Sequence, residues 1–199
     1  ISLDNNNKEE KIIPLLNGMC SEREMKEREE QKLLSVFELD PKKTYYDNKT
    51  QQIIKKIKPE FAIQAYTRSG GDLNKVDPLD LRTPKALRDT MNYILNEIID
   101  SDKFKNKKFT NLLPIDFKEI CLFVIDRFRA IRKNFTILNN MKSNKNCIIC
   151  HEQIARFLII CLNETIDIKS ISGDQGIYNL NMKELNLTLT SLSEFYEYS

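Results

Sequence analysis

Residues 19–38 read MCSEREMKEREEQKLLSVFE, a Met-Cys pair followed directly by a charged segment. Ser21 and Glu24 have the spacing of a capping box, in which the serine oxygen accepts a backbone N–H and the glutamate reaches back to the cap. A helix should therefore begin at Ser21. Its apolar residues gather toward Phe37, so we expect the first turns to be solvated and the last turns to be buried. On physical grounds alone, this is a surface helix whose C-terminal end docks on a core.

The composition is that of a soluble, mostly helical protein. The 199 residues are 41% hydrophobic and 30% charged, and they include five glycines and no tryptophan. So few glycines argue against a β architecture rich in glycine turns, and the length suffices for one core or for a superhelical array. The formal net charge of +2 is too small to indicate a nucleic-acid binder, so any RNA contact has to come from a local patch.

The sequence indicates neither a membrane protein nor a disulfide framework. The longest apolar runs, Ile120–Ile125 and Ile154–Leu162, end well before membrane-spanning length. Residues 1–10 hold acids and asparagines where a signal peptide needs an apolar core, although the chain begins without methionine. Five cysteines, an odd number, suit reduced thiols of a cytosolic or nuclear protein.

The first half of the chain alternates short elements with polar connections. Residues 1–18 should form an extended lead-in that packs across the rest. Because Pro41 stops the first helix, residues 41–58 are predicted to be a poorly ordered connector or a short helix. Residues 59–66 should make about two helical turns, ended by Gly70-Gly71.

Longer helices are predicted in the second half. Thr83 as a cap, with Pro84 at the first helical position, should start a helix that runs to about Asp100. Further helices are expected from Pro114 and Asp116, over Cys147–Glu164, and from an Asn181/Glu184 capping pair, with a basic loop at residues 103–110. Such helices with polar loops predict an all-α fold, an α-solenoid of antiparallel helix pairs.

Blocks of residues spread over most of the chain point to one family. They begin with Met19-Cys20, Glu22-Arg23, Arg28-Glu29 and Phe37-Glu38, and continue with 65–69, 81–84, 90–93, 126–133 and, more weakly, 151–157. Together they resemble the SAC/GANP family, the leucine-permease-regulator-like scaffolds of nuclear mRNA export. Ser21 stands where the family usually has proline, and Gly70-Gly71 where it has small residues such as alanine. The signature residues used below are Met19, Cys20, Glu22, Arg23, Arg28, Glu29, Phe37, Glu38, Tyr66 and Arg68.

The resemblance implies a fold and a role. Residues 19–199 would be the TPR-like helical-repeat part of a PCI-type domain, normally followed by a winged helix that lies outside this chain. Residues 189–198 should then leave apolar surface where that module would pack. The implied function is that of a non-enzymatic scaffold at the nuclear pore, which couples transcription to mRNA export and joins a PCI-domain partner to a small acidic Sem/DSS-type subunit. The chain alone is expected to be a monomer without a cofactor. A paralogue acting at centrosomes or in splicing stays open.

The signature residues at the start of the first helix have a structural interpretation. No ligand or nucleophile partner for Cys20 is found near it in sequence. Met19 and Cys20 are therefore predicted to pack as a small apolar plug before the Ser21 cap.

One cysteine motif raises a cofactor question. Cys147, Cys150 and His151 match the c-type haem attachment pattern, but two isoleucines between the cysteines fit a buried helix better. A zinc site is also disfavoured, because a second ligand pair at suitable spacing is lacking. His151 is the only histidine, and no nucleophile elbow, P-loop or HExxH motif occurs. We therefore expect no catalytic, metal or cofactor site.

A group of basic residues, called the basic ridge below, has three interpretations. It comprises Arg127, Arg129, Arg132 and Lys133. The ridge could contact RNA phosphates without reading sequence, brace neighbouring helices by pairing with acids such as Asp126, or contact a protein partner. An RNA-binding module acting alone is thus the rival function. The lysines of residues 103–108, interleaved with Phe104 and Phe109, are interpreted as a solvated loop that could also touch a nucleic-acid backbone.

Overall fold

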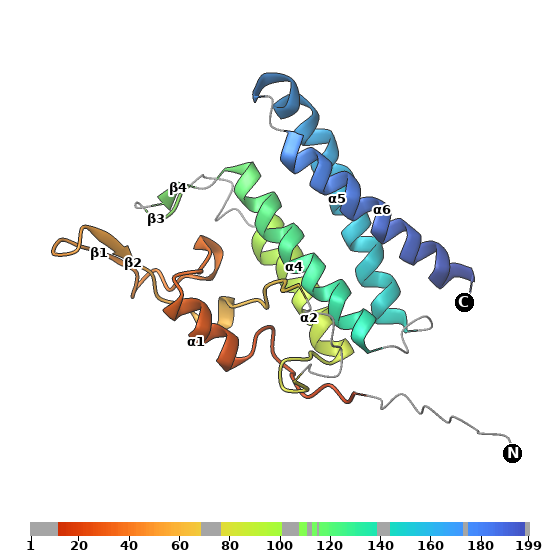
Figure 1. Cartoon of the computed structure of the whole chain (residues 1–199), viewed down its shortest axis with the longest axis horizontal. Coiled ribbons are helices and arrows are strands. Elements are labelled where there is room, and N and C mark those ends of the chain that lie inside the picture. Colours follow the sequence, from red (N-terminus) through yellow and green to blue (C-terminus); the bar gives the residue numbers. More distant parts are fainter. Residues whose placement is uncertain are drawn as a thin grey trace, which may run out of the picture.

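The chain is mostly helical in the computed structural model (Figure 1). The structure describes residues 12–68, 77–100, 108–110, 113–114, 116–138, 144–172 and 175–197. Long helices make up the C-terminal part, whereas residues 12–68 combine one short helix with turns, a hairpin and extended chain. The chain is therefore mostly helical, as expected, but short strands are also present, so it is not entirely α-helical. The stacking of helix pairs into a solenoid stays a prediction.

Helix α1 (Glu22–Glu30) begins where the sequence predicts. The Ser21 side chain accepts a hydrogen bond from the backbone N–H of Glu24 at 3.3 Å, as a helix cap does. The expected continuation into the apolar end of the segment is wrong. Lys32 adopts a left-handed conformation with φ of 59°, which ends the helix, and the chain turns into a 3-10 helix, η1 (Val36–Glu38). This reversal buries Val36 and Phe37 and leaves Leu33 exposed.

A β-hairpin replaces the connector or short helix expected over residues 41–58. Strands β1 (Tyr45–Asp47) and β2 (Gln52–Ile54) pair antiparallel, with Tyr45 opposite Ile54. The Asp47 carboxylate holds the turn by accepting hydrogen bonds from the backbone N–H of Lys49 and the hydroxyl of Thr50. Aromatic and β-branched residues flank this turn, so strand propensity prevailed over the polar composition.

Residues 59–66 do not form the two helical turns expected. Only the single turn η2 (Pro59–Phe61) is present, and residues 62–68 then run extended toward the helices. The backbone N–H groups of Ile63, Ala65 and Tyr66 donate to carboxylates from other elements, so they are not available to a helix. The predicted stop at Gly70-Gly71 lies outside the described residues.

The helical part follows the sequence more closely. Thr83 caps α2 (Pro84–Tyr93), which continues as a π-helical segment, η4 (Ile94–Ile99). Asp116 caps α4 (Phe117–Ile137). The short strands β3 (Lys108–Thr110) and β4 (Leu113–Pro114) pair antiparallel before α4. The basic loop was predicted over residues 103–110: residues 103–107 lie outside the described residues, and residues 108–110 form β3, so the prediction is wrong there.

The last two helices form an antiparallel pair (Figure 1). They are α5 (Lys145–Ser172) and α6 (Gln175–Glu197). Helix α6 begins at Gln175 rather than at the predicted Asn181/Glu184 cap, which is therefore wrong. Both residues are buried within the helix, and the Glu184 carboxylate pairs with arginines of α4. The capping-box spacing thus marks a buried contact here and not a helix start.

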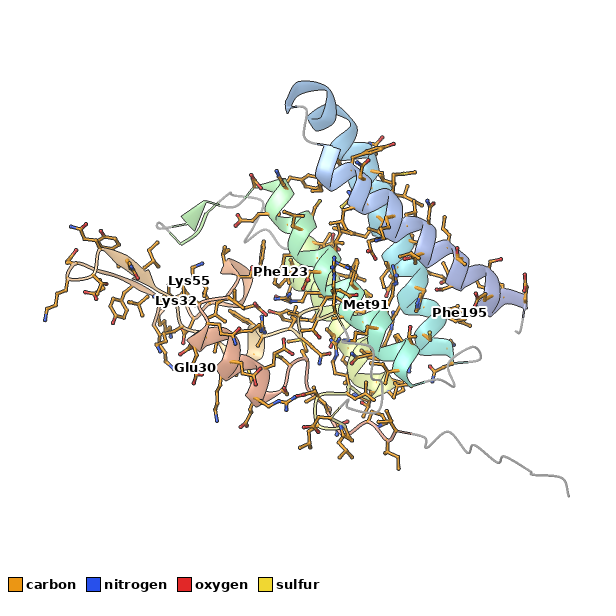
Figure 2. The ribbon with its side chains drawn as sticks, in the orientation of Figure 1. Glu30, Lys32, Lys55, Met91, Phe123 and Phe195 are labelled. Carbon is orange, nitrogen blue, oxygen red and sulfur yellow. The ribbon has the colours of Figure 1, made fainter. Side chains whose placement is uncertain are left out.

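The core lies between α4 and its neighbours. Helix α4 contacts α2, α5 and α6, and Met91 and Phe123 lie in the middle of the molecule (Figure 2). Phe123 stacks on Phe37 with ring centroids 4.6 Å apart, which ties η1 to α4. The described end of the lead-in crosses this body by hydrogen bonds of Leu16 with Leu81 and Thr83. None of the described helices is long and apolar enough to cross a membrane.

Candidate functional site

A buried carboxylate lies at the junction of three elements. Glu38 of η1 is 0% exposed, and its two oxygens accept hydrogen bonds from Arg28 of α1 at 2.8 and 2.7 Å. Arg127 of α4 donates to it at 3.0 Å, and the backbone N–H of Ile63 donates at 3.0 Å. We call Arg28, Glu38 and Arg127 the ion-pair cluster. It joins two signature residues to one member of the basic ridge.

Arg28 of the ion-pair cluster is held in its charged form. Burial lowers the pKa of Arg28, but the charge and hydrogen bonds of Glu38 outweigh burial, and the pKa of Arg28 lies above its usual value. Arg28 also lies 3.2 Å from the Glu24 carboxylate. Arg127 packs over the Phe123 ring at 4.4 Å and pairs with Asp126. Removing one partner from such a cluster leaves a buried charge uncompensated, which typically costs about 3–5 kcal/mol.

Three carboxylates hold the extended segment of residues 62–68. Ile63 donates its backbone N–H to Glu38, Ala65 to Glu24 at 2.7 Å, and Tyr66 to Asp126 at 3.1 Å. The N–H of the intervening Gln64 donates to the carbonyl of Met19. The segment is thus ordered by side chains of α1, η1 and α4 in place of a β-sheet partner.

Of the predicted apolar plug, Met19 packs against the core, whereas the half-buried Cys20 contacts a charged side chain. Met19 is half-buried against the core, and the Cys20 thiol lies 3.5 Å from the Arg28 guanidinium, which donates to it. Burial, followed by the nearby Glu24 charge, raises the pKa of Cys20 to about 12. The thiol is therefore protonated at neutral pH, and a thiolate nucleophile is not available here.

The remaining signature residues serve individual contacts. Glu29 accepts hydrogen bonds from the Ile57 N–H and from Lys56, so its pKa is lowered. Arg23 pairs with Asp77 and Asp80, whereas Glu22 and Arg68 are exposed. The Arg129 guanidinium lies over the Tyr66 ring, 3.9 Å from the ring centroid. Most of the signature residues thus connect elements, which agrees with a structural role.

Arg82 is an important residue that sequence reasoning missed. Its side chain is 0% exposed, and its Nε donates to the Asn134 side-chain oxygen at 3.2 Å. Its two terminal nitrogens have no hydrogen-bond partner among the described residues. Burial lowers the pKa of Arg82 to about 10. Residues 81–84 were recognised as a family block, but nothing in the local pattern marks this arginine as buried.

All four residues of the basic ridge make contacts within the protein. Arg127 belongs to the ion-pair cluster, including the predicted pairing with Asp126. Arg129 and Arg132 both pair with Glu184 of α6, at 3.2 and 3.0 Å. Lys133 donates to the Thr67 carbonyl at 2.7 Å, and burial lowers the pKa of both Arg132 and Lys133. An RNA phosphate would have to compete with these contacts.

A groove of about 850 Å³ lies between α1 and α4. Residues 64–67 line it together with acids and bases of both helices and with the exposed Leu33 and Leu122. Its Glu24 and Asp126 carboxylates already accept backbone N–H groups. These groups stabilise the fold, so the groove does not present them as an acid/base pair.

The Cys147, Cys150 and His151 motif lies within α5 and is buried. His151 donates from Nδ1 to the Cys147 carbonyl at 2.8 Å, and its ring packs against Phe135 and Phe195. Burial lowers the pKa of His151 to about 4 and raises those of Cys147 and Cys150 to about 12 and about 11. Within the described part of the chain, no three His, Cys, Asp or Glu side chains come close enough to hold a metal ion.

Comparisons with known proteins agree with the motif pattern. The model of the SAC3/GANP family matches residues 19–199. "SAC3 family protein 1" of Schizosaccharomyces pombe is 29% identical over 180 residues, which cover 90% of this chain and 15% of that protein. "Protein xmas" of Drosophila melanogaster is 29% identical over 170 residues, which cover 85% of this chain and 7% of that protein. The chain therefore spans only a small part of the length of these curated relatives.

Proposed function

Since the chain belongs to the SAC3/GANP family, we propose that it is a non-enzymatic scaffold subunit of a nuclear complex that couples transcription to mRNA export. The family is linked to mRNA export complexes and its members are generally nuclear. In this proposal the protein acts at the nuclear pore and binds a PCI-domain partner and a small acidic Sem/DSS-type subunit.

The observation that carries the proposal is the family match over residues 19–199. The structure supports the proposal through the contacts that the signature residues make inside the fold. Arg28 and Glu38 join α1, η1 and α4, and the Cys20 thiol is held protonated. Charged groups that serve chemistry are usually accessible to a substrate, whereas these are buried and paired with one another. Such a cluster suits a protein that has to present stable surfaces to its partners.

The outer side of α6 supplies surface for assembly. The sequence predicts apolar surface between residues 189 and 198, and Leu189 and Tyr196 are 46% and 54% exposed. Met182, seven residues before Leu189 and therefore on the same face of α6, is 37% exposed. Exposed apolar residues that gather on one element are typical of protein contacts. We propose that a winged helix packs on this side and that the assembled unit binds the PCI-domain partner.

Co-elution of purified components tests this function. The full-length protein, mixed with its PCI-domain partner and the small acidic subunit, should elute from a size-exclusion column as one complex. The variant Met182→Asp/Leu189→Asp should lose this complex, because it places charges on the apolar side of α6. A matched control is Asn186→Asp/Thr190→Asp, which changes exposed polar residues of the same helix and should co-elute. Separate elution of the unaltered proteins would overturn the proposal.

A further inference from the structure

The segment of residues 41–58, which holds the β1–β2 hairpin and its two flanks, concentrates positive charge that the rest of the chain balances. Residues 41–58 contain six lysines and a single acidic residue, Asp47, although the formal net charge of the whole chain is only +2. Figure 1 shows the hairpin projecting away from the helical body. This geometry allows a long, flexible ligand to approach the hairpin without meeting the helices.

The one carboxylate of the hairpin is occupied by the turn. Asp47 accepts hydrogen bonds from the Lys49 N–H at 2.9 Å and from the Thr50 hydroxyl at 2.8 Å. These bonds lower the pKa of Asp47, so it is ionised and fixed in the turn at neutral pH. It makes no ion pair with a lysine among the described residues. The positive charge of the surrounding lysines is therefore only partly offset.

The lysines divide into those that anchor the hairpin and those that face solvent. At its base, Lys55 donates to the Leu34 carbonyl and Lys56 pairs with Glu29 of α1. Lys32, which follows α1, donates to Gln52 and lies with Lys55 near this base (Figure 2). Lys42 and Lys49 are exposed and make no ion pair with any described residue. Their ammonium groups are therefore available to a ligand.

Two tyrosines stand among these lysines. Tyr45 and Tyr46 of β1 are 55% and 47% exposed, which is unusual for large aromatic side chains in a strand. Because successive side chains of a strand point to opposite faces, each face of the hairpin presents one ring. Tyr45 pairs across the hairpin with Ile54, and Tyr46 with Ile53. Each tyrosine thus has an isoleucine as its cross-strand neighbour, and about half of its side chain is open to solvent.

We propose that the β1–β2 hairpin binds single-stranded RNA that crosses the edge of β1 left unpaired among the described strands. One ring on each face, Tyr45 and Tyr46, then stacks on a base, and Lys42 and Lys49 contact phosphates. Proteins that bind single strands without sequence preference combine positive charge along the backbone with aromatic platforms for bases. An acidic peptide would satisfy the lysines but would leave both rings without a stacking partner, so a nucleic acid fits better. The choice of RNA over DNA rests on the proposed function in mRNA export.

Fluorescence anisotropy with labelled oligouridine tests the hairpin. The 199-residue chain should bind this RNA with an affinity that falls steeply with salt, as phosphate contacts require. The variant Tyr45→Ala/Tyr46→Ala should weaken binding by about 30-fold, because loss of one stacked base costs roughly fivefold or more. The variant Lys42→Glu/Lys49→Glu should lower the slope of log affinity against log salt by about 1.4.

Matched variants separate this surface from general charge. Lys145→Glu/Lys183→Glu makes the same change in net charge at exposed positions of α5 and α6, and it should bind nearly as tightly as the unaltered chain. Unchanged binding by the tyrosine variant or full competition by polyglutamate would each overturn the proposal. The assay needs no partner subunit, so its outcome is independent of the co-elution experiment.

Discussion

The two parts of this molecule are held together by different forces. In residues 12–68, short elements are joined by a buried ion-pair cluster and by carboxylates that accept backbone N–H groups. In the helical part, long helices pack through apolar side chains, such as Phe128 against Phe157 with ring centroids 5.4 Å apart. Hydrogen-bonded charges are directional, whereas apolar packing tolerates small changes in shape. We therefore expect the N-terminal part to depend on individual atoms far more than the helices do.

The largest effect is expected from Glu38→Gln. This change keeps the shape of the side chain but removes the charge that Arg28 and Arg127 share, and it should lower the free energy of unfolding by about 3–5 kcal/mol. Urea unfolding followed by circular dichroism measures this loss. Glu22→Gln, an equivalent change at an exposed residue of α1, should leave the unfolding midpoint unchanged.

A small substitution in the apolar core of the helical part completes this comparison. Ile131 of α4 is 0% exposed, and Ile131→Val should cost only about 1 kcal/mol. If Glu38→Gln cost no more than Ile131→Val, the contrast between the two parts would be wrong.

The next prediction concerns the loss of folding stability at low pH, which we expect from His151 in the helical part. Burial lowers the pKa of His151 to about 4, whereas histidine in the unfolded chain titrates near 6.5. The unfolded chain therefore takes up the proton first as the pH falls. This contribution to stability is complete above about pH 6.5 and is lost toward pH 4, by about 3 kcal/mol in all.

Chemical denaturation between about pH 7 and pH 4.5 measures the histidine contribution. Carboxylates also titrate over this range, so the comparison is between the unaltered chain and His151→Gln, which has no group that titrates there. The variant should lose stability less steeply with acid. Parallel curves for the two proteins would show that His151 does not carry the effect.

The smallest effect is expected where the two parts meet. Arg129 lies over Tyr66 and pairs with Glu184, but its side chain is 26% exposed, so solvent screens both contacts. Arg129→Gln should reduce the free energy of unfolding by less than about 1 kcal/mol. The same variant should bind oligouridine as the unaltered chain does. A loss of RNA affinity would instead favour the basic ridge as the RNA contact.

Sequence reasoning succeeded where a structure depends on neighbouring residues. The caps at Ser21, Thr83 and Asp116 are present as predicted, because each cap bonds to a backbone N–H three residues away. The other half of the predicted capping box is wrong, since the Glu24 carboxylate bonds to the distant N–H of Ala65. The family blocks also identified the residues that meet in the ion-pair cluster, although not how they meet.

Sequence reasoning failed where distant residues decide the backbone. Residues 62–68 are extended because their N–H groups bond to carboxylates as far away as Asp126. The second capping pair failed for the same reason, since Glu184 serves Arg129 and Arg132 of α4 and not a helix start. The basic ridge was found as a group, but its contacts with Thr67 and α6 depend on tertiary packing. No local pattern contains this information.

The ion-pair cluster has a consequence for the order in which the chain folds. Arg28, Glu38 and the N–H of Ile63 are synthesised before Arg127, which follows Glu38 by 89 residues. Contacts between residues so far apart in sequence form slowly, because a long loop has to close first. Until α4 leaves the ribosome, the Glu38 carboxylate has only one of its two arginines. The segment around α1 and η1 is therefore completed only when a much later segment of the chain arrives.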